Sequence, residues 1–388
     1  MRDDSAGRLR CCRCAGQLDP ARPQGLCGCG GMLVYEPDLG AARALDPERL
    51  RRLGAGPRAL GALLPAQEVF LTLGEGNTPL RPAPALGRAC GLPDLWIKDE
   101  TANPTGSFKD RGLAMAVGVA RARGVRRLAL ASAGNAGVSA SLYARAAGLD
   151  LKIVMPRVTP GSYVERARAC GARIELAGAD LGEAGALLRD RLDGEERFDL
   201  STLREPYRVE GKKLIGYEIA LSLRQRPPHW LVFPTGGGTA VIGVHKALTE
   251  MDSLGWLSRS PRLACVQAAG CAPVVRAFEA GEERTRAWED PQTAAWGLRV
   301  PAPLGGERIL EALGSHSGAA VAVGEETMRR GARDLWKLER VPAGLEAGAA
   351  VAGLCSLIER SVVDPSERVV LLITGSPPGG VDSPQGVE

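Results

Sequence analysis

The sequence predicts an α/β protein with mostly parallel sheets covered by helices on both faces, preceded by a small cysteine-rich module. Two observations support this fold class. From about residue 95, short apolar runs of strand character alternate with Ala- and Arg-rich segments of helical period. Before that point, five of the ten cysteines fall within the first 29 residues. With 388 residues, the chain is long enough for two or three domains.

The expected elements follow in chain order. After the cysteines, the apolar stretch Met32–Tyr35 precedes an Arg- and Leu-rich segment that predicts one or two short helices. The expected strands are Leu95–Lys98, Arg127–Ala131, Leu151–Met155, Ala172–Leu176, Trp230–Phe233, Leu263–Gln267 and Val369–Ile373. The expected helices include Ser107–Arg123, Val138–Ala147, Ser162–Cys170, Gly182–Leu192 and Ala240–Leu248. Ligand sites in such sheets lie in Gly-rich turns at the carboxyl ends of the strands, so those turns decide the functional interpretation.

Charge and composition exclude several classes of function. The net charge of +4 is too small to indicate binding to nucleic acid or to an anionic membrane. No uncharged apolar run is long enough to span a bilayer and the first residues do not resemble a signal peptide, so we expect a cytoplasmic protein. The three histidines have no Ser/His/Asp or metal-binding spacing, which leaves a hydrolase without a base. The last stretch, Pro377–Glu388, is expected to be a frayed tail.

The N-terminal cysteines form two pairs, Cys11-x-x-Cys14 and Cys27-Gly-Cys29. Four thiolates brought together by tight turns suit one tetrahedral ion, and zinc is the natural choice in a reducing compartment. Cys12 is an alternative to Cys11 as a ligand, and a group of free thiols without metal is the alternative to a zinc site. The five cysteines outside this cluster lie in apolar surroundings and are expected in the core: Cys90, Cys170, Cys265, Cys271 and Cys355.

Two turns could supply an amine and a ring-facing donor. In Asn103–Gly112, Lys109 falls in the first turn of a helix, where the positive end of the helix lowers the lysine pKa. A neutral amine is what Schiff-base chemistry needs, although a solvated lysine paired with a carboxylate is the commoner case. In Ala131–Ala140, small residues leave room for a flat ring and Asn135 offers a donor. Alone, this second turn is equally consistent with an ordinary capped helix start.

Two further turns could supply an anion site and a hydroxyl. In Pro234–Thr239, three consecutive glycines expose N–H groups at a helix start, which suits a small monophosphate. The last predicted strand ends on the hydroxyl of Thr374, followed by Gly375. An amine, a ring-facing donor, a monophosphate site and a hydroxyl together match pyridoxal 5′-phosphate (PLP).

These motifs resemble the threonine synthase branch of the fold-type II PLP-dependent enzymes. The resemblance includes Gly74-Glu-Gly-Asn-Thr-Pro-Leu80, Lys98-Asp-Glu100 and the lysine segment, and it covers nearly the whole chain. It implies two three-layer αβα subdomains and usually a homodimer. The implied boundaries are a zinc-ribbon-like module at 1–40, a large PLP-binding subdomain at 41–110 and 211–376, a small subdomain at 111–210, and a flexible tail at 377–388.

The resemblance also implies roles for individual residues. Lys109 would bond covalently to PLP and then move protons at Cα and Cβ of the substrate. Asn135 would hydrogen-bond the phenolic oxygen of the cofactor, and Thr374 would face the pyridine nitrogen. The phosphate of PLP would be held by Gly236, Gly237, Gly238 and Thr239. A neutral hydroxyl at the pyridine nitrogen makes a weaker electron sink, which suits elimination and replacement better than transamination.

The implied site for a substrate phosphate is only partly present. Ser132 and Arg208 match the resemblance, and the substrate carboxylate would lie on N–H groups of the turn that Ser132 begins. Ala136 replaces an expected threonine, Leu203 an expected serine and Glu205 an expected asparagine. Each lost charge-assisted hydrogen bond to a dianion is worth about 1.5–3 kcal/mol. Either nearby cations compensate for these losses or the substrate is not a phosphate ester.

The resemblance implies a PLP-dependent lyase that converts O-phospho-L-homoserine and water to L-threonine and phosphate. Further departures, at Gly344–Gly348 and after Gly375, lie where such enzymes shape the substrate side of the pocket. The alternatives are an ammonia-lyase acting on threonine, serine or diaminopropionate, a β-replacement synthase, or a non-catalytic amino-acid-binding protein. The intact Lys109 argues against the last of these. A small-molecule substrate is expected in every case, with no nucleic-acid or membrane partner.

Overall fold

The computed structural model describes residues 7–65, 71–192 and 197–377, and it divides into two compact units. Unit 1 comprises the chain up to Gly76 and residues 109–214, and unit 2 comprises residues 77–108 and the chain from Ile215 onward. The chain therefore crosses between the units three times, once immediately before Lys109. Except for Pro377, the tail expected from the sequence lies outside the described residues.

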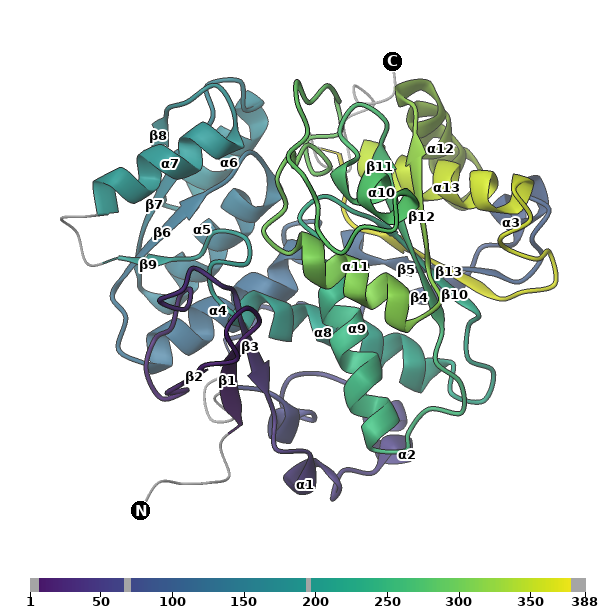
Figure 1. The fold of residues 1–388 in the computed structure, drawn as a ribbon, viewed down its shortest axis with the longest axis horizontal. Coiled ribbons are helices and arrows are strands. Elements are labelled where there is room, and N and C mark those ends of the chain that lie inside the picture. The colour runs from purple at the N-terminus through teal and green to yellow at the C-terminus, as the bar shows by residue number, and fades with distance from the viewer. Residues whose placement is uncertain (1–6, 66–70, 193–196, 378–388) are drawn as a thin grey trace. The chain divides into compact units, whose positions relative to one another are not determined.

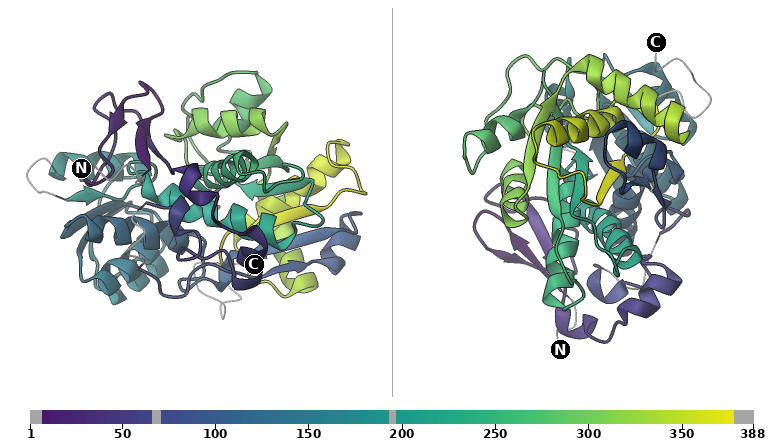
Figure 2. Two further views of the ribbon diagram at one scale, coloured as in Figure 1. Left: turned by 90° about the horizontal axis from the view of Figure 1, so that it is seen from below. Right: turned by 90° about the vertical axis from the view of Figure 1, so that its right-hand side faces the viewer.

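Unit 1 begins with a small antiparallel sheet, purple in Figure 2, whose first strand ends on Cys11. Its strands are β1 (Arg8–Cys11), β2 (Gln17–Leu18) and β3 (Leu33–Glu36), in the order β2-β1-β3. The apolar stretch expected around residues 32–35 forms β3, which pairs Leu33 with Cys11. Short helices follow, as expected: α1 (Leu39–Ala42), α2 (Pro47–Leu53) and the 3₁₀ turn η1 (Gly61–Leu63).

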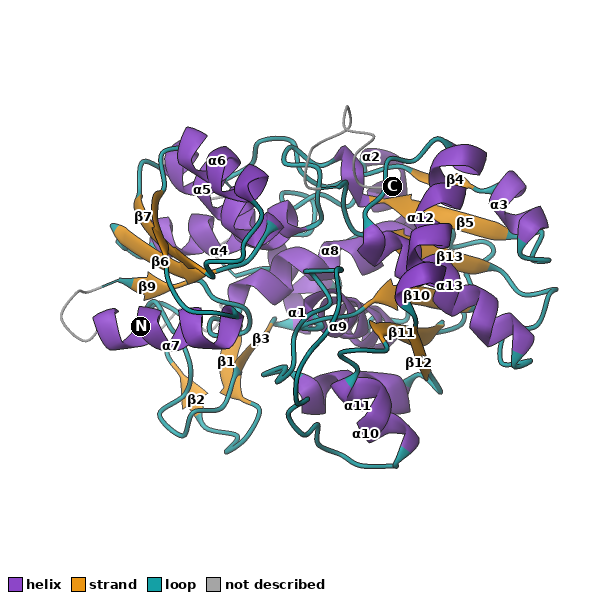
Figure 3. Cartoon of the chain, turned by 90° about the horizontal axis from the view of Figure 1, so that it is seen from above, coloured by secondary structure: helices purple, strands orange, loops and turns teal. Residues whose placement is uncertain are grey.

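The second part of unit 1 is a four-stranded parallel sheet between two helical layers. The strands are β6 (Arg127–Ala131), β7 (Asp150–Met155), β8 (Arg173–Leu176) and β9 (Phe198–Asp199), in the order β8-β7-β6-β9. The helices are α4 (Lys109–Ala122), α5 (Asn135–Ala147), α6 (Gly161–Ala169), α7 (Leu181–Leu192) and α8 (Tyr207–Ser222), the last of which continues into unit 2. One face is covered by α4, α5 and α6, and the other by α7 (Figure 3). Ala184 and Leu188, one turn apart on α7, pack against Ala129 and Val154 of the sheet.

Unit 2 is built on a six-stranded sheet (Figure 1), and its strands lie in the order β12-β11-β10-β13-β5-β4 (Figure 3). The strands are β4 (Leu80–Pro82), β5 (Leu95–Asp99), β10 (Trp230–Pro234), β11 (Arg262–Ala268), β12 (Ala319–Val323) and β13 (Val369–Ile373). Only the edge strand β4 runs antiparallel to its neighbour. Therefore the last strand in sequence, β13, lies in the middle of the sheet and joins the early strand β5 to β10.

Helices cover both faces of this sheet. They are α3 (Pro84–Ala89), the 3₁₀ turn η2 (Glu100–Ala102), α9 (Thr239–Ser253), α10 (Pro273–Glu279), α11 (Gly306–Ser315), α12 (Glu325–Glu339) and α13 (Leu345–Glu359). One face is covered by α13, with α12 packed outside it, and the other face carries α9 and α11 (Figure 3). Ala347, Val351 and Leu354 form a helical stripe on α13 that is buried in the main core of the unit.

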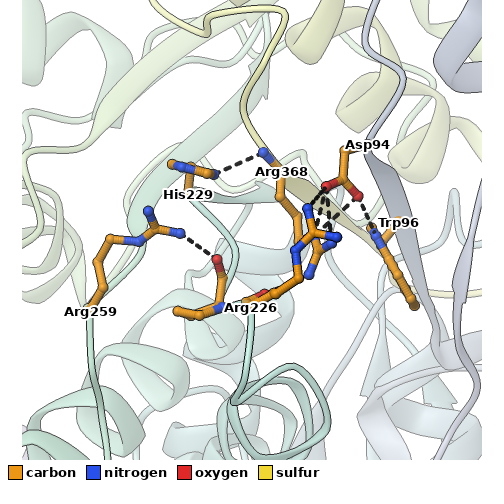
Figure 4. Close-up of polar contacts among 7 residues, drawn as sticks. Asp94, Trp96, Arg226, His229, Arg259 and Arg368 are labelled. Carbon is orange, nitrogen blue, oxygen red and sulfur yellow. Dashed lines mark hydrogen bonds and ion pairs between the residues drawn. The ribbon is translucent and has the colours of Figure 1, made fainter.

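The amino ends of three parallel strands in unit 2 are tied together by one polar network (Figure 4). Asp94, just before β5, accepts hydrogen bonds from the Trp96 indole at 2.8 Å and from the Arg368 guanidinium at 3.0 Å. The backbone N–H of Arg368 donates to Nδ1 of His229 at 2.9 Å. This contact requires an unprotonated Nδ1, and burial, aided by the positive charge of Arg259, lowers the pKa of His229. The network fixes the edge of the sheet opposite to the carboxyl ends of the strands.

The predicted fold class is confirmed, and every predicted strand is present to within a residue or two. Within the described ranges, no helix combines the length and the apolar character needed to cross a bilayer. The expectation of five core cysteines is wrong in part. Cys265 and Cys271 are buried, but Cys90, Cys170 and Cys355 are only half-buried. Cys90 and Cys170 end helices and Cys355 lies at the edge of the core, where one side of each side chain reaches solvent.

Candidate active site

The segment that leads to Lys109 is held by a buried acid. Lys109 is the first residue of α4, in agreement with the prediction, and its side chain is half-buried. The carboxylate of Glu100, which is fully buried, accepts hydrogen bonds from the Asn103 amide at 2.8 Å and from the Thr78 hydroxyl at 2.7 Å. The Asn103 carbonyl in turn accepts from the Gly106 N–H at 2.7 Å. The turn before the lysine is therefore fixed by side chains as well as by its own backbone.

The three residues before the lysine also pair antiparallel with the segment that follows β13. The N–H of Phe108 donates to the Thr374 carbonyl at 2.9 Å, and the N–H of Ser376 donates to the Gly106 carbonyl at 2.9 Å. Thr374 is buried and directly follows β13. Phe108, the residue before Lys109, is therefore held by the backbone of Thr374, whose hydroxyl is predicted to face the pyridine nitrogen of the cofactor.

The predicted phosphate loop joins β10 to α9 and has no space for side chains. A Cβ on Gly236 would lie 2.1 Å from the Gly297 carbonyl oxygen, and one on Gly238 would lie 2.2 Å from the Ile309 side chain. Gly238 also has a φ of 77°, and no side chain of the described residues caps the helix that starts at Thr239. The N–H groups at the start of this 15-residue helix are thus available to an anion. Because β10 and β13 are parallel neighbours, the loop and Thr374 share one edge of the sheet.

The glycine loop packs against Gly297, and Gly297 is held by a side chain at the start of α13. A carboxylate oxygen of Glu346, in the first turn of that helix, accepts a hydrogen bond from the Gly297 N–H at 2.8 Å. Gly297 is the residue whose carbonyl oxygen lies against Gly236. The N–H of Gly344 donates to the Gly375 carbonyl at 3.3 Å, so the same helix start also contacts the segment after β13. Glu346 lies in the stretch where the sequence departs from the resemblance, and this departure was the only signal that marked it.

Unit 1 contains the other predicted residues, at the carboxyl ends of β6 and β9. The hydroxyl of Ser132 accepts hydrogen bonds from the N–H of Gly137 at 2.9 Å and of Gly134 at 3.3 Å, and so shapes the turn before α5. Asn135 is the first residue of that helix and is half-buried. The N–H of Ala131 donates to the Ser201 hydroxyl at 3.0 Å, which links this turn to the segment after β9. The two segments therefore lie at one edge of the small parallel sheet.

Arg208 lies in the first turn of α8 and is almost completely buried. One terminal nitrogen donates to the Leu200 carbonyl at 2.8 Å, and its Nε has no hydrogen-bond partner among the described residues. A buried donor without a partner costs about 1–3 kcal/mol, so a bound anion that accepted from it would recover that cost. Within the described residues, the Nε of Arg208 is therefore an unpaired donor that suits an anionic ligand.

Glu205 lies just before the same helix, and its side chain caps the first turn. Its carboxylate accepts from the N–H of Tyr207 at 2.6 Å and of Arg208 at 3.1 Å. Burial raises the pKa of Glu205 to about 7, although the positive charge of Arg208 and the two N–H groups oppose the rise. A glutamate here keeps the cap that an asparagine would provide, and it adds a titratable negative charge beside Arg208. The sequence shows that Glu205 replaces an expected asparagine, but it does not show that this side chain caps the helix.

The four predicted zinc ligands come together in unit 1. The sulfur atoms of Cys11, Cys14, Cys27 and Cys29 all lie within 4.8 Å of one another. Cys11–Cys29 is 3.5 Å and Cys14–Cys27 is 3.7 Å, close to the roughly 3.8 Å expected for two thiolates on one tetrahedral zinc. A Cβ on Gly31 would lie 2.6 Å from the Cys11 sulfur, so a glycine is needed there. Of the two adjacent cysteines, it is Cys11 whose sulfur lies in this group.

Comparison with known proteins identifies the family. The family model described as "Pyridoxal-phosphate dependent enzyme" matches residues 71–375, which include both glycine-rich turns, Lys109 and Thr374. This chain belongs to the pyridoxal-phosphate-dependent enzymes. The enzyme is therefore expected to carry PLP, as the four turns predicted. The glycine loop, with its close backbone packing and uncapped helix start, fits the phosphate of that cofactor.

Two relatives resemble the enzyme over nearly its whole length. A threonine synthase of Methanosarcina acetivorans is 31% identical over 370 residues, covering 95% of this chain and 91% of the relative. A threonine synthase of Methanocaldococcus jannaschii is 30% identical, covering 94% and 91%. These matches confirm the threonine synthase-like resemblance.

Solved structures confirm the fold-type II architecture alone, because their sequences are more distant. Maize serine racemase aligns with a TM-score of 0.69 at 19% identity, covering 88% of this chain and 94% of that one. Threonine deaminase isoform 2 of Solanum lycopersicum aligns with a TM-score of 0.66 at 23% identity, covering 77% and 84%. The fold is thus shared by enzymes with different reactions, and it does not select a substrate.

Proposed function

We propose that the enzyme is a threonine synthase that converts O-phospho-L-homoserine and water to L-threonine and phosphate. The observation that carries the proposal is the match to two threonine synthases along more than nine-tenths of the chain. The deaminases and racemases among the structural neighbours share the fold at under 25% identity. The N-terminal cysteine cluster would hold a structural zinc ion that stabilises its own small module.

Each of the predicted residues would contact a different part of the cofactor. Gly236, Gly237, Gly238 and Thr239 would bind the phosphate of PLP through N–H groups and the Thr239 hydroxyl. Asn135 would donate to the phenolic oxygen of the cofactor, and Thr374 would offer a neutral hydroxyl to the pyridine nitrogen. When bound, PLP supplies an electron sink for negative charge that develops at the substrate Cα. The neutral partner at the nitrogen keeps that sink weak, which favours elimination and replacement.

Lys109 would move the protons of the reaction. Its amine would take the proton from the substrate Cα and exchange protons at Cβ. The start of α4 lowers the cost of the neutral amine, because the positive helix end disfavours an ammonium group. The hydrogen bonds from Phe108 to Thr374 and from Asn103 to Glu100 support this role by fixing the backbone that leads to the lysine.

Ser132 and Arg208 would bind the substrate. The N–H groups at the start of α5, in the turn shaped by Ser132, would receive the substrate carboxylate. Arg208 would attract the substrate phosphate, and its unpartnered buried Nε supports an anionic ligand. The acid at Glu205 would be better tolerated when protonated, which its raised pKa makes accessible near neutral pH.

A second candidate is an ammonia-lyase that acts on serine, threonine or diaminopropionate. It is favoured by the loss of hydroxyl donors at Ala136 and Leu203 and by the carboxylate of Glu205, all of which weaken a site for a phosphate dianion. A substrate without a phosphate would not need those donors.

One pair of assays separates the two candidates. The PLP-loaded enzyme is incubated with O-phospho-L-homoserine, and phosphate and threonine are measured together. A parallel sample receives serine, threonine or diaminopropionate, and ammonia and the 2-oxo acid are measured. Equimolar phosphate and threonine support the proposal. Ammonia and a 2-oxo acid without threonine formation from the phosphate ester would overturn it in favour of the lyase.

A matched pair of variants ties the activity to the predicted lysine. Lys109→Ala is expected to abolish turnover, whereas Lys337→Ala, on the exposed face of α12, is expected to leave it unchanged. Equal loss in both variants would point to instability rather than to a role in the chemistry.

A further inference from the structure

Two cysteines outside the N-terminal cluster face each other in unit 2. The sulfur atoms of Cys90 and Cys355 are 3.4 Å apart, although the residues are 265 positions apart in sequence. Cys90 caps the end of α3, and Cys355 lies in the second half of α13. Neither belongs to the candidate active site or to the zinc ligands. No spacing motif connects them, so the fold alone creates the pair.

The backbone on the α3 side of the pair is firmly held. The carboxylate of Glu339, at the end of α12, accepts hydrogen bonds from the N–H groups of Ala85 at 3.0 Å and Leu86 at 2.9 Å, and so caps α3. It also binds the Arg81 guanidinium at 3.1 Å. The N–H of Cys90 closes the other end of α3 by donating to the Leu86 carbonyl at 3.0 Å. The backbone of α3 up to Cys90 is therefore fixed by hydrogen bonds at both ends of the helix.

Both thiols are partly accessible to solvent, and the two thiols differ in pKa. Both thiols are half-buried at the edge of the main core, whereas Cys265 is fully buried and its burial raises the thiol pKa to about 12. The hydrogen bond from Cys90 lowers the pKa of Cys355, and Arg330 adds to the effect while burial opposes it. Either sulfur can donate this hydrogen bond, and with Cys90 as the donor the pKa of Cys90 is raised. Cys355 is thus the better nucleophile, and Cys90 is the thiol positioned to react second.

We propose that Cys90 and Cys355 are a modification site that closes reversibly to an intramolecular disulfide when the enzyme meets a small-molecule disulfide. The Cys355 thiolate attacks one sulfur of an oxidant such as glutathione disulfide and releases one glutathione thiol. The Cys90 thiol then loses its proton and attacks the Cys355 sulfur of the mixed disulfide, which releases the second glutathione thiol. Two protein thiols are oxidised and one external disulfide is reduced, so atoms and electrons balance.

Closure would tie α13 to α3 and thereby restrain the helix whose first turn carries Glu346. Because the new bond closes a very long loop of chain, it restricts the unfolded state strongly, and the oxidised protein should unfold at a higher temperature. The cross-link includes none of the predicted catalytic residues, so it would restrain unit 2 rather than modify the site itself.

The test uses the full chain with zinc and PLP bound, equilibrated with glutathione buffers from fully reduced to fully oxidised. Free thiols are then alkylated, and the protein is digested and analysed by mass spectrometry without reduction. The expected result is a cross-linked peptide pair containing Cys90 and Cys355 that appears with oxidation and disappears after dithiothreitol. Peptides in which both cysteines remain alkylated after full oxidation would overturn the proposal. So would stable glutathione adducts on both cysteines without a cross-link.

Variants identify the two partners separately. Cys355→Ser is expected to leave Cys90 as a free thiol or a glutathione adduct, and Cys90→Ser is expected to trap the glutathione adduct on Cys355. Cys170→Ser is the matched control, because Cys170 is equally half-buried but has no thiol neighbour among the described residues. This variant should form the cross-link as the wild type does, and loss of the cross-link in it would contradict the assignment. The wild-type measurement decides the proposal even if one variant fails to fold.

Discussion

The close packing behind the phosphate loop makes Gly236→Ala a sharp test of the cofactor site. The added Cβ would lie 2.1 Å from the Gly297 carbonyl oxygen and 3.1 Å from a methyl group of Val300. Ordinary contact begins near 3.4 Å, so the loop or the Gly297 segment must move by about 1 Å. The oxygen is a backbone atom that Glu346 holds through the Gly297 N–H, so it cannot turn aside as a flexible side chain would.

The cost follows from overpacking of a tight contact, which is typically about 1–3 kcal/mol. If that cost falls on the loaded form, the dissociation constant for PLP rises roughly fivefold to 150-fold. The assay is titration of the PLP-free protein with PLP, followed by absorbance. Thermal unfolding of the PLP-free protein is measured in parallel, so that a loss of PLP affinity can be distinguished from destabilisation of the fold.

The matched control is Gly314→Ala on α11 in the same unit. A Cβ there meets nothing within 4 Å, so the variant should bind PLP as the wild type does and gain about 0.5–1 kcal/mol of stability from the helix. A Gly236→Ala enzyme with unchanged PLP affinity would refute the inference that this loop holds the phosphate.

Four further outcomes are expected. Lys109→Ala should lose the visible absorbance band that PLP gains when it bonds to the wild-type protein, and a band of unchanged position and intensity would contradict the assignment. Cys14→Ser should lose the roughly one zinc ion per chain expected from the four-thiol site, measured by elemental analysis, while unit 2 remains folded; full metal content would argue against it. Burial, aided by the charges of His316 and Arg308, lowers the pKa of His245 to about 4, so the folded state resists its protonation. Its contribution to stability is present above pH 6.5 and is lost as the pH falls toward 4, by up to about 3 kcal/mol in denaturant titrations, and His245→Gln should flatten that slope. Glu205→Gln keeps a cap acceptor but removes the charge beside Arg208, so it should lower KM for a phosphorylated substrate about threefold to tenfold with little change in kcat; an unchanged KM would place the substrate phosphate elsewhere.

Local chemistry explains how much of the fold could be predicted. The seven predicted strands are short runs rich in apolar residues, so their positions follow from the sequence. The strand Ala319–Val323 was not predicted, because its small alanines give a weak strand signal and its place at the sheet edge depends on pairing with β11. The two-residue strand at Phe198–Asp199 is too short to produce any periodicity.

The residues of the candidate site also divide into those that the sequence predicts and those that it does not. Lys109, the three glycines and the four thiols can be selected as candidates from the sequence, because the chemistry expected of them depends on spacing along the chain. Glu100, Glu346 and Glu205 were not assigned their roles, because each acts on a backbone N–H or an amide that folding brings to it. A side chain that supports a site from a distant segment leaves no local pattern.

The position of β13 has a consequence for how the protein is made. The segment before Lys109 pairs with residues 374–376, which are synthesised more than 260 residues later. The central strand that joins β5 to β10 is also synthesised after every other strand in the described residues. A nascent or prematurely ended chain therefore has the lysine but not the backbone that holds it in place. The proposed cofactor site can therefore form only after β13 and residues 374–376 have been synthesised.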